Sequence, residues 1–313
     1  SATVAVGSTA TRSLLMMSRT VVMPPTKPSR RRLGREALRA WYVPRRRAYP
    51  WRGSHDPYAV WVSEVMLQQT QASRVVPAFR SFLHRFPTVR ALAAAPRRDV
   101  VLEWGGLGYN RRAVGLSEAA RAIVRDHGGR IPRDPATLRE LPGIGPYTAA
   151  AVASLGFGQP VAVVDTNVRR VVARVHVGID GHEAPAKQVW ALADAWLDRD
   201  DPATWNQAVM DLGREVCRPE PRCDVCPLRR VCRFRRSGVT ARRGPRRQGS
   251  FEGSSRQARG AVVDALCSKR SLTPASLAAE IGFARSRVDA AVESLVLDGL
   301  LEFYAGRVRL AGS

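Results

Sequence analysis

Glu64 stands within an apolar helical pattern that runs from Val60 to Thr70. A carboxylate among apolar neighbours is costly to bury in its ionised form, so desolvation should raise its pKa. A pKa near neutrality is what a general acid needs at physiological pH. We therefore expect Glu64 to donate a proton. The alternative is a glutamate on a solvated face of the helix.

Asp165 directly precedes a predicted helix and follows Gly145 by twenty residues. An aspartate in this place is commonly an N-cap, which is worth about 1 kcal/mol. Beside the sugar of a bound nucleotide, the same carboxylate could stabilise or trap an oxocarbenium ion, as in glycoside cleavage. Glu64 and Asp165 together predict a two-carboxylate set with one proton donor and one cation stabiliser.

A Leu-Pro-Gly-Ile-Gly sequence at 141–145 leads into a predicted helix that contains Tyr147. Glycines at alternate positions permit a tight turn and let a phosphate approach the backbone. The following helix offers unpaired N–H groups to an anion. A lone Gly-x-Gly is often only structural, but here it joins two helices in a strongly basic chain. We expect Gly143 and Gly145 to bind the DNA backbone.

Four cysteines follow the pattern C-x5-C-x2-C-x5-C, namely Cys217, Cys223, Cys226 and Cys232. Four thiolates without a histidine suit either zinc or a [4Fe–4S] cluster, and the spacing alone does not choose between them. Such a cluster of cysteines indicates metal binding in a reducing compartment rather than a disulfide framework. We expect a cytoplasmic protein. Cys267 lies apart and is expected to be a small buried apolar side chain.

The chain carries 50 Lys and Arg residues against 27 Asp and Glu, a formal net charge of +23. This excess attracts polyanions and releases counterions when phosphates are neutralised, so nucleic acid is the expected partner. We find no apolar run of 18 residues and no lysine-rich amphipathic helix, so we expect no membrane partner.

Apolar residues recur at three- and four-residue spacing along most of the chain, which predicts a mainly α fold. The strand pair at 301–304 and 307–310, after three predicted helices, suggests a winged helix-turn-helix. This unit could either pack on the core or contact DNA or a partner. The arginine-rich linker before it favours contact with DNA or a partner. The expected segments are a disordered basic tail (1–32), one helical lobe (33–55 with 159–232), a six-helix lobe (56–158), a basic linker (233–256) and a winged-helix-like domain (257–313).

Several motifs together resemble the MutY adenine glycosylases, a branch of the helix-hairpin-helix superfamily that includes endonuclease III. The resemblance runs from Pro50 to Cys232. It rests on Pro-Trp-Arg-Gly at 50–53, Asp-Pro-Tyr at 56–58, Ser-Glu-Val-Met-Leu-Gln-Gln-Thr at 63–70 and Gly-Leu-Gly-Tyr at 106–109. It implies a two-lobed helix-hairpin-helix fold and favours the [4Fe–4S] cluster over zinc.

The resemblance also implies a reaction, the release of adenine opposite 8-oxoguanine or guanine in double-stranded DNA by a bacterial, nucleoid-associated monomer. Glu64 would protonate adenine at N7, and Asp165 would support the cationic sugar. The remaining roles are ordering the site (Asn167, Tyr147), holding the protonation network (Arg52) and entering the duplex beside the extruded nucleotide (Gln69, Tyr109). Bifunctional relatives have a Schiff-base lysine where Tyr147 stands. No lysine occurs between Lys27 and Lys187, so we expect a monofunctional enzyme.

The chain departs from the family pattern at three places. The first cysteine gap is five residues instead of six, and Asn110 replaces a second tyrosine. Residues 256–313 resemble the shortened tails of actinobacterial members rather than the NUDIX-like domain that reads 8-oxoguanine. Two other functions remain open, a thymine or uracil glycosylase acting at G·T or G·U mispairs, and a non-catalytic DNA-binding module. The two carboxylates argue against the second.

Overall fold

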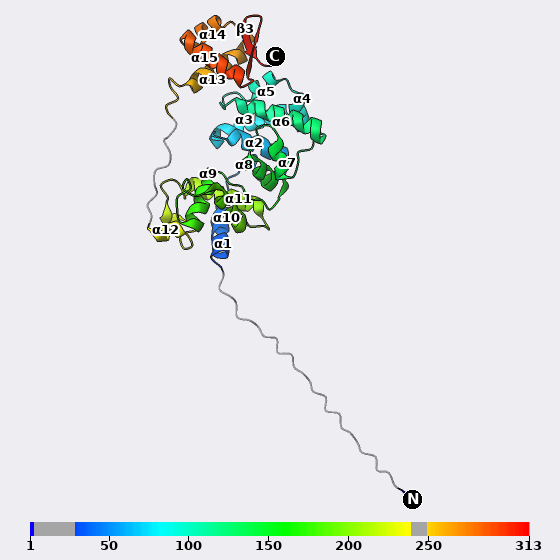
Figure 1. Ribbon diagram of the computed structural model, residues 1–313, viewed down its shortest axis with the longest axis vertical. Helices are drawn as coiled ribbons and strands as arrows, with labels where there is room; N and C mark the ends of the chain where they lie inside the picture. Colours follow the sequence, from blue (N-terminus) through cyan, green and yellow to red (C-terminus); the bar gives the residue numbers. More distant parts are fainter. Residues whose placement is uncertain (3–28, 239–248, 313) are drawn as a thin grey trace.

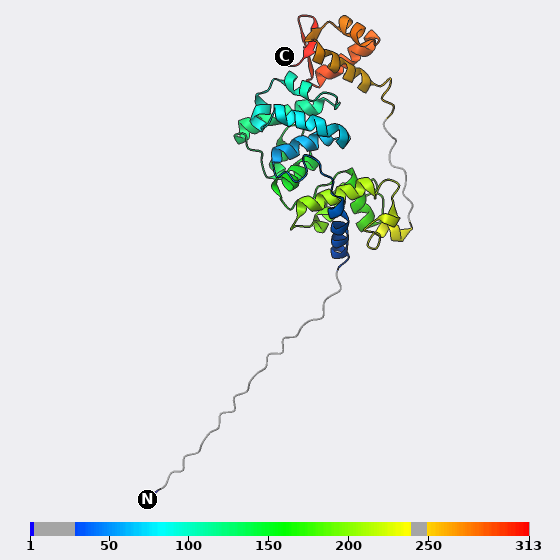
Figure 2. The ribbon, with the colours of Figure 1, turned by 180° about the vertical axis from the view of Figure 1, so that it is seen from behind.

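Helices make up most of the computed structural model, which describes residues 1–2, 29–238 and 249–312 (Figures 1 and 2). The prediction of a mainly α fold is confirmed. The expected tail falls largely on residues 3–28, outside the described residues. Helix α1 already begins at Arg30, because the Ser29 side chain caps it by accepting from the Arg32 N–H, so the tail prediction was wrong at its end.

A first lobe contains the helices that surround Glu64 and the glycine-rich turn. Aromatic side chains fill its core, with the rings of Phe82 and Trp104 in edge-to-face contact at 6.1 Å. Capping residues set the helix starts: Asp56 accepts from the Tyr58 N–H, and Thr88 from the Ala91 N–H. The helices are α2 (Pro57–Leu67), α3 (Ala72–Arg85), α4 (Val89–Ala94), α5 (Arg97–Glu103), α6 (Arg111–His127), α7 (Pro135–Glu140) and α8 (Pro146–Ala151).

A second lobe joins the start of the chain to its middle, since α1 packs beside α11 although they are far apart in sequence (Figures 1 and 2). Its separate core includes Trp196 and Trp205, whose rings meet edge to face at 4.8 Å. The helices are α1 (Arg30–Tyr42), α9 (Thr166–Val172), α10 (Ala186–Trp196), α11 (Pro202–Glu215) and α12 (Arg233–Ser237), with short 3-10 turns at Val43–Arg45 and Cys223–Val225.

The C-terminal unit packs on the first lobe at α5 and α6 (Figure 1). Arg97 Nη1 donates to the Gly299 carbonyl at 2.9 Å, and the apolar core of the unit is continuous with that of the first lobe. Its strands form an antiparallel sheet in the order β1-β3-β2, with Leu301 opposite Leu310. The elements are α13 (Ser255–Ser268), β1 (Ser271–Leu272), α14 (Pro274–Ile281), α15 (Arg285–Leu297), β2 (Leu301–Tyr304) and β3 (Arg307–Leu310).

The structure differs from the sequence expectations at a few elements. Helix α12 occupies the start of the predicted linker, because Phe234 is buried and the Arg174 guanidinium lies over its ring at 4.9 Å. Residues 239–248 of that linker lie outside the described residues. Helices α8 and α9 each continue as a π-helical turn, at Val152–Gly156 and Ala173–Val177. Across the described ranges, no helix combines the length and apolarity needed to cross a membrane.

Candidate active site

Glu64 lies in the interior of α2, a helix whose residues from Tyr58 to Met66 are all buried. Its carboxylate accepts a hydrogen bond from the Tyr147 hydroxyl. Burial raises the pKa of Glu64 to about 7, although the Tyr147 bond acts in the opposite direction. At neutral pH a large share of this carboxyl group is therefore protonated and able to donate.

Tyr147 reaches Glu64 from the first turn of α8, directly after the glycine-rich turn. Burial and the neighbouring Glu64 raise the pKa of its phenol well above 10. The hydroxyl therefore stays protonated and acts as a hydrogen-bond donor. The charge of Asp165 raises the pKa of both Glu64 and Tyr147, which places these three side chains within electrostatic reach of one another.

Asp165 caps helix α9 and is held by two donors. One oxygen accepts from the Val168 N–H at 2.6 Å, and the other accepts from Asn167 Nδ2 at 2.8 Å. Burial raises the pKa of Asp165, while both hydrogen bonds favour its ionised form. The N-cap and the candidate catalytic carboxylate are thus the same side chain, and the cap fixes its direction.

A chain of hydrogen bonds links Asp165 to the cysteine loop. Arg170 Nη2 donates to the Asn167 side-chain oxygen at 2.9 Å, and Arg170 Nε donates to the Cys217 carbonyl at 2.6 Å. Gly213 on α11 leaves room for this arrangement, because a Cβ at that position would meet the Asn167 Cβ at 2.7 Å. The geometry of Asn167 therefore depends on both α11 and the cysteine loop.

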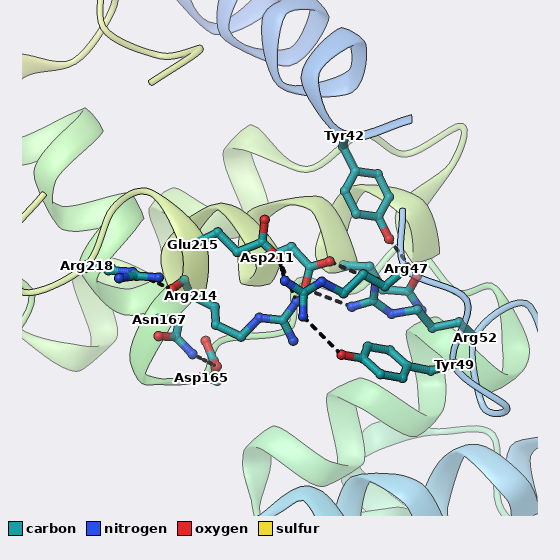
Figure 3. A network of polar contacts seen from close by, with 11 residues as sticks. Tyr42, Arg47, Tyr49, Arg52, Asp165, Asn167, Asp211, Arg214, Glu215 and Arg218 are labelled. Carbon is teal, nitrogen blue, oxygen red and sulfur yellow. Dashed lines mark hydrogen bonds and ion pairs between the residues drawn. The ribbon is translucent and has the colours of Figure 1, made fainter. Parts of the chain in front are cut away.

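Arg52 forms a bidentate pair with Asp211 rather than with Glu64 (Figure 3). Both N–H···O distances are 2.8 Å, and both side chains are less than one tenth exposed. Arg52 still lowers the pKa of Glu64 through its charge. Sequence reasoning did not find Asp211. The available signal was a lone carboxylate within the apolar pattern of α11, the same signal that pointed to Glu64.

Gln69 and Tyr109 lie in two loops, after α2 and before α6. Both have positive φ angles, 56° and 49°, in a backbone region that non-glycine residues rarely adopt. Gln69 is exposed, and Tyr109 is 42% exposed. Arg112 contacts both loops.

The glycine-rich turn follows α7 and brings Gly143 against helix α6. Gly143 has a φ of 71°, and a Cβ there would lie 3.5 Å from the Gly115 Cα. Gly145 is the N-cap of α8 and has open space where a side chain would project. The backbone of the turn is thus accessible at Gly145, as the approach of a phosphate would require.

The four cysteines line one cavity next to Arg174. Arg174 Nη1 lies 3.7 Å from the Cys217 sulfur. Burial raises the pKa of the Cys226 thiol to about 12 and also raises that of Cys217, so thiolates here need a cationic partner. In the part of the chain that is described, no three His, Cys, Asp or Glu side chains are grouped so as to hold a metal ion.

Comparisons with known proteins place this architecture in context. Residues 62–195 match the family described as HhH-GPD superfamily base excision DNA repair protein. An adenine DNA glycosylase of Mycolicibacterium smegmatis is 43% identical over 282 residues, covering 88% of this chain and 95% of that protein. An adenine DNA glycosylase of Mycobacterium tuberculosis is 40% identical over 299 residues, covering 93% and 98%.

The fold is shared with a solved structure, a thermostable thymine-DNA glycosylase. The TM-score is 0.62 at 30% sequence identity, and the match covers 66% of this chain and 97% of that one. The predicted helix-hairpin-helix glycosylase fold is thus confirmed.

Proposed function

Because this chain belongs to the HhH-GPD superfamily of base excision DNA repair proteins, in its adenine DNA glycosylase branch, we propose that it releases adenine mispaired with 8-oxoguanine or guanine. The observation that carries the proposal is the buried Glu64 carboxyl, with a pKa of about 7, in electrostatic reach of Asp165. One group donates a proton while the other steadies a cation.

Glu64 is the proposed proton donor. Its carboxyl transfers a proton to adenine N7, which makes the base a better leaving group as the bond to the sugar breaks. The Tyr147 hydroxyl donates to Glu64 and holds the carboxyl in place. Arg52, paired with Asp211, contributes positive charge nearby and limits the rise of the Glu64 pKa.

Asp165 is the proposed stabiliser of the oxocarbenium ion that remains on the sugar. A carboxylate beside such an ion can stabilise it or trap it as a covalent intermediate. The hydrogen bonds from Val168 and Asn167 support the ionised form. Water then forms a bond from its oxygen to the sugar carbon, and the proton that it loses returns to the Glu64 carboxylate, which gave its own proton to the departing adenine. Tyr147 offers no amine, so the reaction ends at the abasic site.

Gln69 and Tyr109 are proposed to enter the duplex beside the extruded nucleotide. The backbone at Gly143 and Gly145 is proposed to bind a phosphate of the DNA. Unstacking costs a few kcal/mol and least at a mispair, so extrusion contributes to selectivity. We propose that the protein acts as a monomer on double-stranded DNA that carries a mispaired base. We further propose that it acts in the bacterial cytoplasm, at the nucleoid.

A [4Fe–4S] cluster is the proposed cofactor, held by Cys217, Cys223, Cys226 and Cys232. Four thiols on the wall of one cavity are the donor set that such clusters use, although zinc uses it as well. When bound, the group would fix the loop that follows α11, and no catalytic step passes through it. The purified protein should contain about four irons per chain and absorb at about 400 nm. Zinc in elemental analysis would contradict the assignment.

A panel of duplexes that carry A·8-oxoG, A·G, T·G or U·G tests the function, scored for abasic sites after alkaline cleavage. We expect release from the two adenine duplexes. Release from T·G or U·G alone would assign the chain to pyrimidine mispairs, and binding without any release would leave only a DNA-binding module.

A further inference from the structure

Two residues of the proposed wedge share an unusual backbone conformation. Within the described residues, three non-glycine residues have positive φ angles, and two of them are Gln69 and Tyr109. Such conformations cost of the order of 1–3 kcal/mol and persist only when the surrounding structure enforces them. The two residues lie in separate loops, so a single group that enforces both conformations has to contact both loops.

One side chain, Arg112 in the first turn of α6, makes contact with both loops. Its Nη1 donates to carbonyls at the end of α2 and just beyond it, and its Nη2 donates across the gap between the loops. The acceptors are the carbonyls of Val65 (2.9 Å), Met66 (2.9 Å) and Gln68 (2.6 Å) for Nη1, and the Thr70 hydroxyl (3.1 Å) and the carbonyls of Gly108 (3.0 Å) and Leu107 (3.4 Å) for Nη2.

Contacts with aromatic rings and with a helix end offset part of the cost of burying the charge of Arg112. Its guanidinium lies over two rings, 5.2 Å from the centroid of Trp104 and 5.6 Å from that of Tyr109. It also donates to carbonyls at the C-terminal end of α2, where the helix dipole is negative and a cation is stabilising. Burial lowers the pKa of Arg112 to about 10, so the group stays charged at neutral pH.

We propose that Arg112 is a positioning residue that holds Gln69 and Tyr109 as one rigid wedge and thereby assists extrusion of the nucleotide. This inference rests on the proposed function, because that function assigns extrusion of the nucleotide to Gln69 and Tyr109. Arg112 is not assigned contact with the base or the reacting atoms. The planar fork of arginine can bind both loops at once, whereas the single ammonium of lysine cannot.

The first experiment separates extrusion from chemistry. Arg112→Gln and Arg112→Lys are compared with the unchanged protein in single-turnover release of adenine from two duplexes. In one the adenine is opposite guanine; in the other it is opposite an abasic-site analogue, where no base pair opposes extrusion. We expect a loss of roughly tenfold or more on the paired duplex, which corresponds to about 1.4 kcal/mol, and a clearly smaller loss on the unpaired one.

Arg121→Gln serves as the matched control. Arg121 lies on the same helix and also donates to two backbone carbonyls, those of Ala93 and Ala95, but away from both wedge loops. Its loss should affect the two duplexes equally. Equal losses for Arg112→Gln on both duplexes, or full rescue by Arg112→Lys, would overturn the proposal.

A second readout does not depend on base release. With 2-aminopurine at the target position opposite guanine, the fluorescence rise on binding reports unstacking of that base. Arg112→Gln should reduce the rise, and adding it to the Tyr109→Ala variant should cause little further loss, because residues of one unit are not additive. A fluorescence rise in Arg112→Gln as large as that of the unchanged protein would refute the proposed role of Arg112. If the unchanged protein released no adenine, while Arg112→Gln still reduced the fluorescence rise, the proposed reaction would be refuted and the role of Arg112 would stand.

Discussion

At the scale of single residues, Glu64 is the one acid in a helix that is buried from Tyr58 to Met66. Its pKa of about 7 predicts how activity depends on pH. Because the protonated carboxyl is the proton donor, the rate constant of base release should fall as the pH rises through about 7. Single-turnover rates between pH 5.5 and 9 on an A·G duplex measure this. A rate that stays constant through that range would rule out Glu64 as the general acid.

Replacement of Glu64 by glutamine should separate activity from stability. Base release should fall by at least about a hundredfold, the usual contribution of a general acid. The folded state holds the proton of Glu64 more tightly than the unfolded state, so the stability that this proton provides declines as pH rises from about 4.5 to 7. At pH 8 the variant, which buries no charge here, should therefore melt at a higher temperature.

The control for this stability effect is Glu293→Gln, since Glu293 is an exposed glutamate on α15. The melting temperatures of both variants are compared with that of the unchanged protein at pH 5 and pH 8. A Glu64→Gln protein that is less stable at pH 8 would mean that the ionised carboxylate is well compensated in the folded protein.

Asp165→Asn should abolish release while keeping the fold. Asparagine caps a helix about as well as aspartate, so α9 should keep its first turn and the variant loses only the negative charge. Base release should fall by at least about a hundredfold, while affinity for the A·G duplex stays the same. Gel-shift titration and single-turnover kinetics on one preparation measure both. Normal release by this variant would remove Asp165 from the proposed mechanism.

At the scale of elements, α9 and α11 meet at Gly213. A Cβ on Gly213 would lie 2.7 Å from the Asn167 Cβ and 2.9 Å from its carbonyl oxygen, too close for either backbone to remain in place. Gly213→Ala should destabilise the fold by about 1–3 kcal/mol and slow release by displacing Asn167 from Asp165. Chemical denaturation and single-turnover kinetics measure the two effects.

Gly260→Ala is the matched control, because Gly260 also lies within a helix but has open space at the Cβ position. That substitution should stabilise the protein by about 0.5–1 kcal/mol through helix propensity. The same outcome for Gly213→Ala would show that α9 and α11 are not closely packed in solution.

Local sequence was sufficient for the helices and insufficient for contacts between distant segments. Helices α4, α6 and α7 can be located from local sequence, because apolar periodicity coincides there with Thr88 and Asp134 as caps and Gly128 as a stop. Strand β1 was missed, since two residues carry no periodicity and their partner, β3, lies 36 or more residues away.

The same limit applies to the candidate site. Glu64 and Asp165 could be singled out because each has a local signal, burial within an apolar helix or a place before a helix. Asp211 pairs with Arg52 across 159 residues, and Arg112 binds carbonyls at the end of α2 and just beyond it, 44 to 47 residues away. Such pairings depend on how the helices pack, so a single sequence does not reveal them.

At the scale of the whole molecule, the positive charge is unevenly distributed. Residues 249–313 carry eight Lys and Arg against seven Asp and Glu, so almost all of the excess of +23 lies outside the C-terminal unit. On α15, Arg285 is paired with Asp289 at 2.8 Å. A nearly neutral unit contributes little to the attraction of phosphates. Of the two roles left open by the sequence, the structure therefore favours packing on the core.

This docking predicts that the C-terminal unit and the first lobe unfold together. Arg97 joins them through Nη1, which donates to the Gly299 carbonyl at 2.9 Å. Its Nη2 donates to Glu118 within the first lobe at 3.0 Å, and the side chain is 21% exposed. Hydrogen bonds that involve a charged group are worth about 1.5–3 kcal/mol. Arg97→Ala should therefore lower the melting temperature or split the calorimetric transition in two, while release at 25 °C from an A·G duplex stays unchanged.

The comparison for Arg97→Ala is Arg85→Ala, which removes an exposed arginine whose pair with Asp99 spans 3.7 Å. Exposed pairs of this kind are worth about 0–1 kcal/mol, so its melting curve should match that of the unchanged protein. If the two variants melted alike, the Arg97 contacts would not couple the C-terminal unit to the first lobe. The continuous apolar core, which also spans both parts, would then have to provide the coupling alone.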